Sequence, residues 1–400
     1  PETAGDTARN PDAAWESQSL PIGNGSLGAN IMGSVEAERI TFNEKTLWRG
    51  GPNTAKGADY YWNVNKQSAH LLDEIRQAFT EGNQEKAEML TRQNFNSEVS
   101  YDADGETPFR FGSFTTMGEF YVETGLNIIG MSDYKRILSL DSAMAVVQFK
   151  KDHVVYQRNY FISYPANVMR FSADQPGKQN LVFSYAPNPV STGNMASDSN
   201  KGLVYSASLD NNGMKYVVRI QAETKGGTLS NADGKLMVKG ADEVVFYITA
   251  DTDYKPDFDP DFKDPKTYVG VNPEETTKEW MNNAVSQGYT ALFSQHYNDY
   301  AALFDRVKLN LNPAIKGRNL PTPQRLKNYR AGNMPANLQG IWHNNVDGPW
   351  RVDYHNNINI QMNYWPACST NLNECMLPLV DFIRTLVKPG EKTAKSYFGA

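Results

Sequence analysis

The sequence predicts a multidomain β plus α protein, in which a large antiparallel β-sandwich is followed by helices. Short apolar runs recur at intervals of roughly 10–15 residues between about 117 and 250, with polar turns between them, which is typical of antiparallel strands. Apolar residues at helical spacing appear from about Ser68 and again from Pro273. The length of 400 residues exceeds that of one typical domain.

Residues 12–66 mix strand-like runs with glycines. The runs cover Leu20–Gly28, Ile31–Gly33 and Ile40–Asn43, and Asn24-Gly25 within the first predicts a tight turn. A helical insertion is expected near 68–95. Its first helix ends at Gly82-Asn83 and a shorter one covers Gln84 to Arg92. One face of the first helix carries the apolar side chains Leu71, Leu72, Ile75, Ala78 and Phe79.

The long β region contains a clear hairpin signal. Val146–Phe149 and Val154–Tyr156 flank the polar segment Lys150–His153. Further strands are predicted at Val168–Phe171, Leu181–Tyr185, Leu203–Ser206, Tyr216–Ile220 and Val244–Ile248. The Asp-, Pro- and Lys-rich segment from Asp251 to Pro273 is interpreted as a domain linker.

Helical period returns at Pro273, which opens a helix that carries Trp280, Met281 and Ala284. A second helix carries apolar residues from Leu292 to Phe304, and another is predicted from Leu377 to Leu386, ending before Pro389-Gly390. An isolated helix pair cannot bury both of its apolar faces, so this region either caps the sandwich or is the start of something longer. We expect the second, with the helical domain truncated at Ala400.

Composition and charge exclude several partners. The net charge is −6 and no basic run is present, which argues against nucleic acid and anionic membrane. No segment approaches about 18 consecutive apolar residues, so no membrane span is expected. The N-terminus lacks an apolar signal core, and it fits either a mature secreted protein or a trimmed one. Cys368 and Cys375 would lie about 10 Å apart on a helix, so unpaired structural thiols are expected.

The segment Trp350–Ala367 is rich in neutral hydrogen-bonding groups. Four asparagines and one glutamine alternate there with two tryptophans and two tyrosines. Buried amides need hydrogen-bond partners, and aromatic rings pack on weakly apolar ring faces. Together they indicate a carbohydrate ligand.

Glycosidic bond cleavage generally uses a pair of carboxyl groups. Asp353 and Glu374 are the nearby candidates, but neither has an apolar context that would raise its pKa, and a solvated or capping role is the simpler interpretation. The sequence has no phosphate-binding loop, metal-ligand spacing or nucleophile elbow, and its five histidines are scattered. We expect no metal and no cofactor.

Four motifs in order resemble glycoside hydrolase family 95, which contains α-L-fucosidases and some α-L-galactosidases. They are Leu20–Ala29, Asn43–Pro52, Asn337–Trp342 and His355–Trp365. The resemblance implies an N-terminal β-sandwich domain over 1–255, a helical linker over 256–310, and the incomplete start of a catalytic (α/α)6 barrel over 311–400. It also implies an exo-acting, inverting enzyme that releases terminal α-L-fucose from a fucosylated oligosaccharide or glycan.

The same resemblance assigns roles to residues. Asn357 and Asn359 match the pair that positions the attacking water. His355 matches a position that contacts the sugar near its C5 substituent, and the alternative is a packing or hydrogen-bonding histidine. A weakly basic amide needs a nearby carboxylate to help it activate water. The family's general-acid glutamate and helper aspartate would lie beyond residue 400.

Other substrate-binding candidates carry an alternative structural role. Trp342, Trp350 and Trp365 either line the pocket or form barrel core. Three residues of the first domain either reach the mouth of the barrel or stabilise the interface between the domains: Asn43, Glu44 and Trp48.

One departure from the family pattern concerns the barrel. Arg330 runs directly into Ala331-Gly-Asn, where the family carries a further helix, so a closed barrel is not expected from this chain. An α-L-galactosidase, or a non-catalytic fragment that binds sugar or a partner, therefore stays open as an alternative. A periplasmic or extracellular location goes with the family.

Overall fold

The computed structural model describes residues 11–49, 68–95, 113–164, 166–210, 212–255, 269–307, 344, 355–370 and 376–399. The chain divides into two compact units, which are described separately. The sandwich unit comprises Pro1–Leu47, Phe114–Asp253 and Val271–Asp353, and the helical unit comprises Trp48–Ser113, Tyr254–Gly270 and Tyr354–Ala400.

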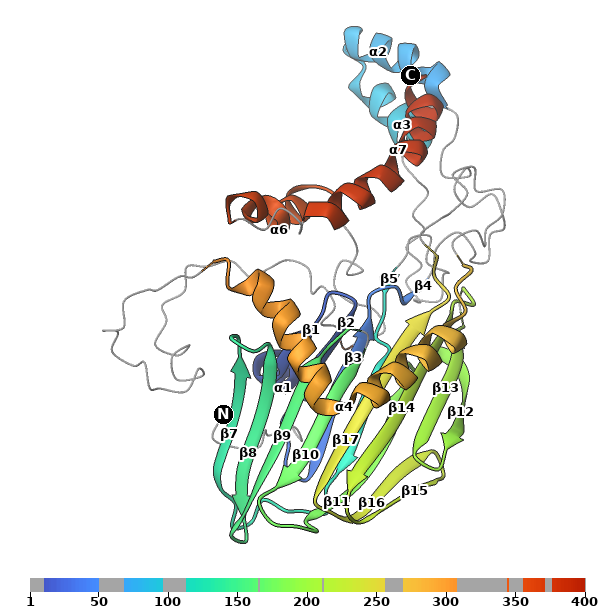
Figure 1. Ribbon diagram of the computed structural model, residues 1–400. Helices are drawn as coiled ribbons and strands as arrows, with labels where there is room; N and C mark the ends of the chain where they lie inside the picture. Colours follow the sequence, from blue (N-terminus) through green and yellow to red (C-terminus); the bar gives the residue numbers. More distant parts are fainter. Residues whose placement is uncertain are drawn as a thin grey trace, which may run out of the picture. The chain divides into compact units, whose positions relative to one another are not determined.

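The sandwich unit contains two antiparallel sheets (Figure 1), which confirms the predicted β-sandwich. The seven-stranded sheet has the order β1-β2-β3-β6-β11-β16-β15. Its strands are β1 Leu20–Gly23, β2 Leu27–Ile31, β3 Ala37–Glu44, β6 Gly118–Glu123, β11 Gln179–Pro187, β15 Thr228–Ala232 and β16 Lys235–Ala241.

The eight-stranded sheet has the order β12-β13-β14-β17-β10-β9-β8-β7. Its strands are β7 Ser132–Ser139, β8 Met144–Lys151, β9 Val154–Ile162, β10 Asn167–Ala173, β12 Ser191–Ser199, β13 Gly202–Leu209, β14 Lys215–Lys225 and β17 Glu243–Thr252. A separate short sheet pairs β4 (Trp48–Arg49) with β5 (Ser113–Phe114).

Aromatic side chains hold the two sheets together. Phe120 on β6 lies 5.5 Å, centroid to centroid, from Phe183 on β11 of the same sheet. Phe183 in turn stacks at 4.8 Å on Phe246 of β17 in the other sheet. All three rings are fully buried. Large buried rings dominate core energetics, so this contact fixes how the sheets face each other.

A buried polar network also joins the sheets. The Glu38 carboxylate on β3 accepts from Arg158 Nη1 at 3.1 Å and from the Tyr160 hydroxyl at 2.8 Å, both on β9. The Gly33 amide donates to the same carboxylate at 2.6 Å. Burial and the neighbouring Glu38 charge raise the pKa of Tyr160 well above its ordinary value. Because the charges are paired and hydrogen-bonded, the site tolerates their burial.

Both predicted turns are confirmed. Gly25 adopts a φ of +84°, and the Asn24 Oδ1 accepts from the amides of Ser26 and Leu27 at 2.9 and 2.8 Å. Asn24 Nδ2 donates to the Ser163 carbonyl at 3.2 Å, which ties this hairpin to the chain just after β9. At the β8–β9 turn, Asp152 and His153 both have positive φ, as a two-residue hairpin requires.

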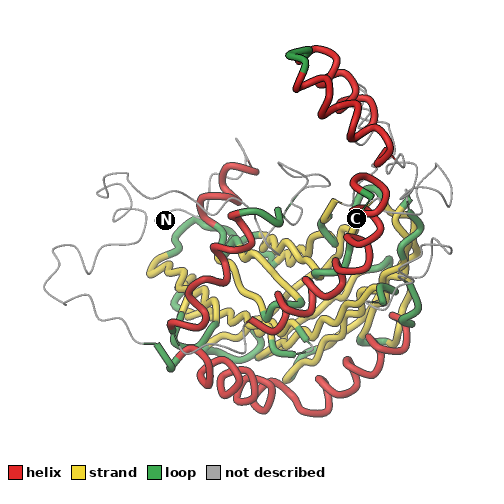
Figure 2. The backbone as a smooth tube through the Cα atoms, turned by 90° about the horizontal axis from the view of Figure 1, so that it is seen from above, coloured by secondary structure: helices red, strands yellow, loops and turns green. Residues whose placement is uncertain are grey.

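Two helices accompany the sandwich: α1 (Pro11–Gln18) and α4 (Pro273–Phe304). α4 lies across the outer face of the eight-stranded sheet, over β17 and β14 (Figures 1 and 2). It buries Met281, Ala284 and Leu292 against the sheet. Gly288, with φ +72° and ψ 171°, breaks it into two halves, which confirms the two predicted helices.

The predicted linker begins too early at Asp251. β17 continues to Thr252, and the Asp251 carboxylate accepts from Thr276 Oγ1 of α4 at 2.6 Å. The Asp-, Pro- and Lys-rich composition predicted a linker from this residue onward, but the Asp251 carboxylate anchors α4 to β17.

The helical unit contains η1 (Ser68–Leu71), α2 (Leu72–Thr80), α3 (Gln84–Phe95), α6 (Ile358–Ser369) and α7 (Leu377–Phe398). The end of α2 is confirmed, since Gly82 has a φ of +73° and the Asn83 amide donates to the Ala78 carbonyl at 2.8 Å. Phe79 is 57% exposed, so the apolar face predicted for this helix is buried only in part. The α2–α3 contact uses the narrower stripe of Ile75 and Ala78 against Ala87.

α7 is longer than predicted. It continues through Pro389-Gly390 and ends at Gly399, which has a φ of +68°. Proline removes one hydrogen bond from a helix, but packing further on can offset that loss. Here the rings of Tyr397 and Phe398 lie 5.6 and 6.2 Å from Phe95 of α3.

Some predictions fall outside the described residues. These concern the missing barrel helix at Arg330–Ala331 and the motif Asn337–Trp342. In the part of the chain that the structure describes, no helix has the length and apolar character needed to cross a membrane.

Candidate active-site segment

The N-terminus of α6 leaves an asparagine amide uncommitted. Asn357 occupies the N-cap position with φ −92° and ψ −146°, and its side chain makes no capping hydrogen bond. An N-cap asparagine ordinarily accepts from an amide of the first turn. Here the backbone carbonyl of His355 takes that place, accepting from the Ile360 amide at 3.3 Å. The exposed Asn357 amide therefore stays available to bind something else.

Asn359 lies in the first turn of α6 and is half-buried. Its side chain has no hydrogen bond to any of the described residues. In a regular helix, side chains two residues apart point to different faces. The backbone at Asn357 is not helical, so its angles determine how the amides of Asn357 and Asn359 are oriented relative to each other. Asn363, one turn further on and exposed, shares the face of Asn359. Its spacing of four residues from Asn359 makes it a further candidate for contact with a ligand at this face.

The indole of Trp365 is 63% exposed on α6. Ile358 and Met362 share its face, at 46% and 55% exposure. The positions i, i+4 and i+7 form one apolar stripe. His355 is half-buried just before the helix. Trp342 and Trp350 lie outside the described residues.

Asn43 and Glu44 at the end of β3 are buried. The Asn43 Oδ1 accepts from the Met117 amide at 3.2 Å. The Glu44 carboxylate accepts from the Thr46 amide at 2.7 Å and from the Thr46 hydroxyl. Burial raises the pKa of Glu44 to about 7, although the hydrogen bonds from Thr46 lower it. The Glu44 side chain thus holds the turn that follows β3, whereas the Asn43 side chain ties β3 to the segment before β6.

The candidate residues are divided between the two units. Asn43 and Glu44 belong to the sandwich unit. The helical unit contains Trp48, which is half-buried, together with His355, Asn357, Asn359 and Trp365.

The carboxylates considered from sequence, Asp353 and Glu374, lie outside the described residues, as does Cys375. Cys368 is free, as predicted, and its side chain is exposed on α6. The helix turns its Ala367 side inward instead. Within the described ranges, no three His, Cys, Asp or Glu side chains are grouped so as to hold a metal ion.

The chemistry available at the start of α6 is neutral. Two amides can accept hydrogens from a water molecule or a sugar hydroxyl and donate in return. They carry no charge and so require a carboxyl group elsewhere to move a proton.

Comparison with known proteins gives the class. Residues 7–257, more than half of the chain, match the glycosyl hydrolase family 65 N-terminal domain. This domain contains both sheets of the sandwich. The chain thus belongs to the family that this N-terminal domain defines.

The particular family follows from the second match. Residues 330–400 match the glycosyl hydrolase family 95 catalytic domain, and they include α6 with its asparagines. The chain belongs to the glycoside hydrolases that join these two domains, as a family 95-like N-terminal portion, which confirms the resemblance read from the motifs.

The chain is also similar to curated proteins. The chain is 29% identical over 421 residues to a protein named probable α-fucosidase A from Aspergillus niger, covering 95% of the chain and 50% of the relative. It is 28% identical over 454 residues to α-L-fucosidase 2 from Arabidopsis thaliana, covering 98% of the chain and 50% of the relative. The chain spans about half the length of these relatives.

Among solved structures, a candidate kojibiose phosphorylase from the human microbiome has a TM-score of 0.43 and 8% identity. The alignment covers 74% of this chain and 37% of that one. The family assignment rests on the sequence matches.

Proposed function

We propose that this chain belongs to an exo-acting, inverting glycoside hydrolase that releases terminal α-L-fucose from glycans. The substrate class is supported by the relatives named as α-fucosidases and by the family 95 match over 330–400. A periplasmic or extracellular site of action, where such glycans occur, is part of the proposal.

The observation that carries the mechanism is the free amide at the N-cap of α6. Capping would have given Asn357 a local partner worth about 1 kcal/mol. A polar side chain that forgoes this partner is available to a ligand. Asn359 in the same turn is equally uncommitted among the described residues.

In the proposed reaction, Asn357 and Asn359 orient one water molecule. Their amide oxygens accept its hydrogens, which directs an oxygen lone pair at the anomeric carbon. An inverting site needs room for this water between its two carboxyl groups. One carboxyl group must take the water's proton and the other must protonate the leaving oxygen.

The test is hydrolysis of an aryl α-L-fucoside and an aryl α-L-galactoside by the whole protein to which this chain belongs. We expect the fucoside to be cleaved with the higher kcat/KM. NMR of the first product should show β-L-fucose, because inversion converts the α anomer to the β anomer. Release of α-L-fucose first would overturn inversion. Preference for the galactoside would make the protein an α-L-galactosidase, and no turnover of either would favour a binding role.

A further inference from the structure

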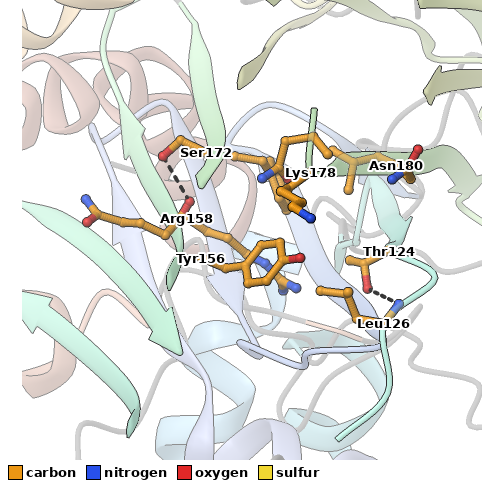
Figure 3. A pocket seen from close by; sticks show the side chains of 11 residues that line it. Thr124, Leu126, Tyr156, Arg158, Ser172, Lys178 and Asn180 are labelled. Atoms are coloured by element: carbon orange, nitrogen blue, oxygen red, sulfur yellow. Dashed lines mark hydrogen bonds between the residues drawn. The ribbon is translucent and has the colours of Figure 1, made fainter. Parts of the chain in front are cut away.

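The two sheets of the sandwich unit leave a hollow between them near the start of β11 (Figure 3). One wall comes from β9 and β10, with Tyr156 and Phe171. The other comes from the segment after β6 and from Lys178–Leu181. Counted with the open solvent at its mouth the hollow spans about 250 Å³, but only about 10 Å³ of this is room for the centre of a water molecule, about what one water needs.

A buried amide in this wall has no partner. Gln179 is only 4% exposed, and its Nε2 makes no hydrogen bond. Leaving a buried amide donor unpaired costs roughly 1–3 kcal/mol. Native proteins generally satisfy such groups, so an unpaired donor lining a hollow points to a bound acceptor.

Irregular strand pairing accompanies this side chain. The pairing of β11 with β16 changes register between Gln179 and Leu181. Asn180 lies at the irregularity, where its Oδ1 accepts from the Gly240 amide at 3.0 Å. Such bulges redirect side chains and are frequent beside binding sites.

The other groups around the hollow favour a hydroxyl-bearing ligand. The ring of Tyr156 stacks on Phe149 at 5.1 Å, which holds it as a rigid wall. Its hydroxyl has no hydrogen bond to the described residues. The exposed Lys178 adds a donor at the rim.

An anion fits this hollow less well. The Arg158 guanidinium is already bound to Glu38 and to the carbonyls of Ser34 and Val35. Asp152 and Asp174 lie near enough to Tyr156 to help burial raise the pKa of its hydroxyl. Their charges oppose a bound anion.

We propose that this hollow is an accessory site for a neutral polyhydroxylated ligand, a sugar, whose hydroxyl accepts a hydrogen bond from Gln179 Nε2. The bottom of the hollow is wide enough to hold a hydroxyl group but too narrow to hold a sugar ring. The ring therefore lies at the mouth, against Tyr156 and within reach of Lys178. This site shares no residue with the proposed hydrolytic site and does not depend on the proposed activity.

The test is saturation-transfer difference NMR of L-fucose and D-galactose with the whole protein. Gln179→Met removes the donor at similar volume, and Gln221→Met on β14 is the matched control. We expect Gln179→Met to lower the D-galactose signal at least about fivefold, with the control unchanged, while L-fucose keeps the part of its signal that comes from the proposed fucose-releasing site. Asn359→Ala should retain the signal that depends on Gln179, which separates this site from the hydrolytic one.

Two further results decide the proposal. If Gln179→Met gave the wild-type sugar signal, the site would be wrong. Displacement of the Gln179-dependent signal by millimolar inorganic phosphate would make it an anion site and likewise overturn the proposal. Should Gln179→Met fail to fold, Tyr156→Phe replaces it, since it removes only the free hydroxyl. It should lower the signal about twofold or more, and an unchanged signal counts against the site.

Discussion

The sandwich unit and α6 of the helical unit differ in how far their apolar side chains are exposed to solvent. In the sandwich, Phe120, Phe183 and Phe246 are fully buried and contact one another. On α6, Ile358, Met362 and Trp365 form an apolar stripe that the described residues leave exposed. Strands that pair in sheets supply one another's cover, whereas a single helix depends on neighbours for its apolar face. Stability is thus expected to reside in the sandwich, and chemistry at α6.

The largest expected effect is in the sandwich core. Phe246→Ala should lower the free energy of unfolding by about 3–5 kcal/mol, because it leaves a cavity beside Phe183. Ile137→Ala, at an exposed position on β7, is the control and should change it by less than about 1 kcal/mol. Urea denaturation followed by circular dichroism measures both. Equal losses of unfolding free energy in the two variants would contradict the expectation that the buried rings of the sandwich carry its stability.

The second effect is a pH dependence at Glu44. Its pKa in the folded protein is about 7, above the ordinary value of 4.5, so between these values the folded state binds more protons than the unfolded state. Its contribution to stability is therefore fully present below pH 4.5 and is lost as the pH rises through 7. The total is on the order of 3 kcal/mol.

Glu44→Gln should flatten this dependence in denaturation series between pH 4.5 and 8. Asp251 and Asp253, whose pKa values burial also raises, will leave a residual slope of the same sign. A variant with the same slope as the wild type would show that Glu44 ionises normally.

Third in size is the effect at the proposed water-binding amide. Asn359→Ala should lower kcat/KM for an aryl α-L-fucoside by about 10²-fold, a loss typical of groups that assist proton transfer. The unfolding free energy should stay within about 0.5 kcal/mol of wild type. Asn356→Ala, a neighbouring exposed asparagine, is the control and should retain activity. Normal turnover by Asn359→Ala would remove the water-positioning role.

The smallest expected effect is on stability at the exposed stripe. Trp365→Ala should change the free energy of unfolding by less than about 0.5 kcal/mol, because its indole is 63% exposed. A loss of several kcal/mol in the whole protein would show that the stripe is covered there. That result would separate a core role for Trp365 from a sugar-binding one.

Local signals in the sequence predicted much of the fold. Asn24-Gly25 and the Lys150–His153 segment identified hairpins, because positive φ and short polar turns have few sequence solutions. Gly82-Asn83 identified the end of α2 for the same reason. The extension of α7 past Pro389 was missed, since it depends on contacts of Tyr397 and Phe398 with Phe95, which is far away in sequence.

The site was less predictable than the fold. Asn357 and Asn359 came from the motif, but their free amides depend on a backbone angle that no local pattern specifies. The hollow beside Gln179 was not anticipated, because it needs two sheets and an irregular register to form. The burial of Glu44 likewise depends on strands distant in sequence.

The turn at Asn24 affects the choice of host for recombinant production of the protein. Asn24-Gly25-Ser26 fits the acceptor pattern for N-linked glycosylation. A glycan attached to Nδ2 would occupy the space in which this nitrogen meets the Ser163 carbonyl. Expression through a eukaryotic secretory pathway would then hinder closure of the first hairpin, whereas bacterial expression would not. Ser26→Ala would remove the glycosylation pattern with little loss of stability, since the Ser26 hydroxyl makes only a long 3.5 Å contact with Glu44.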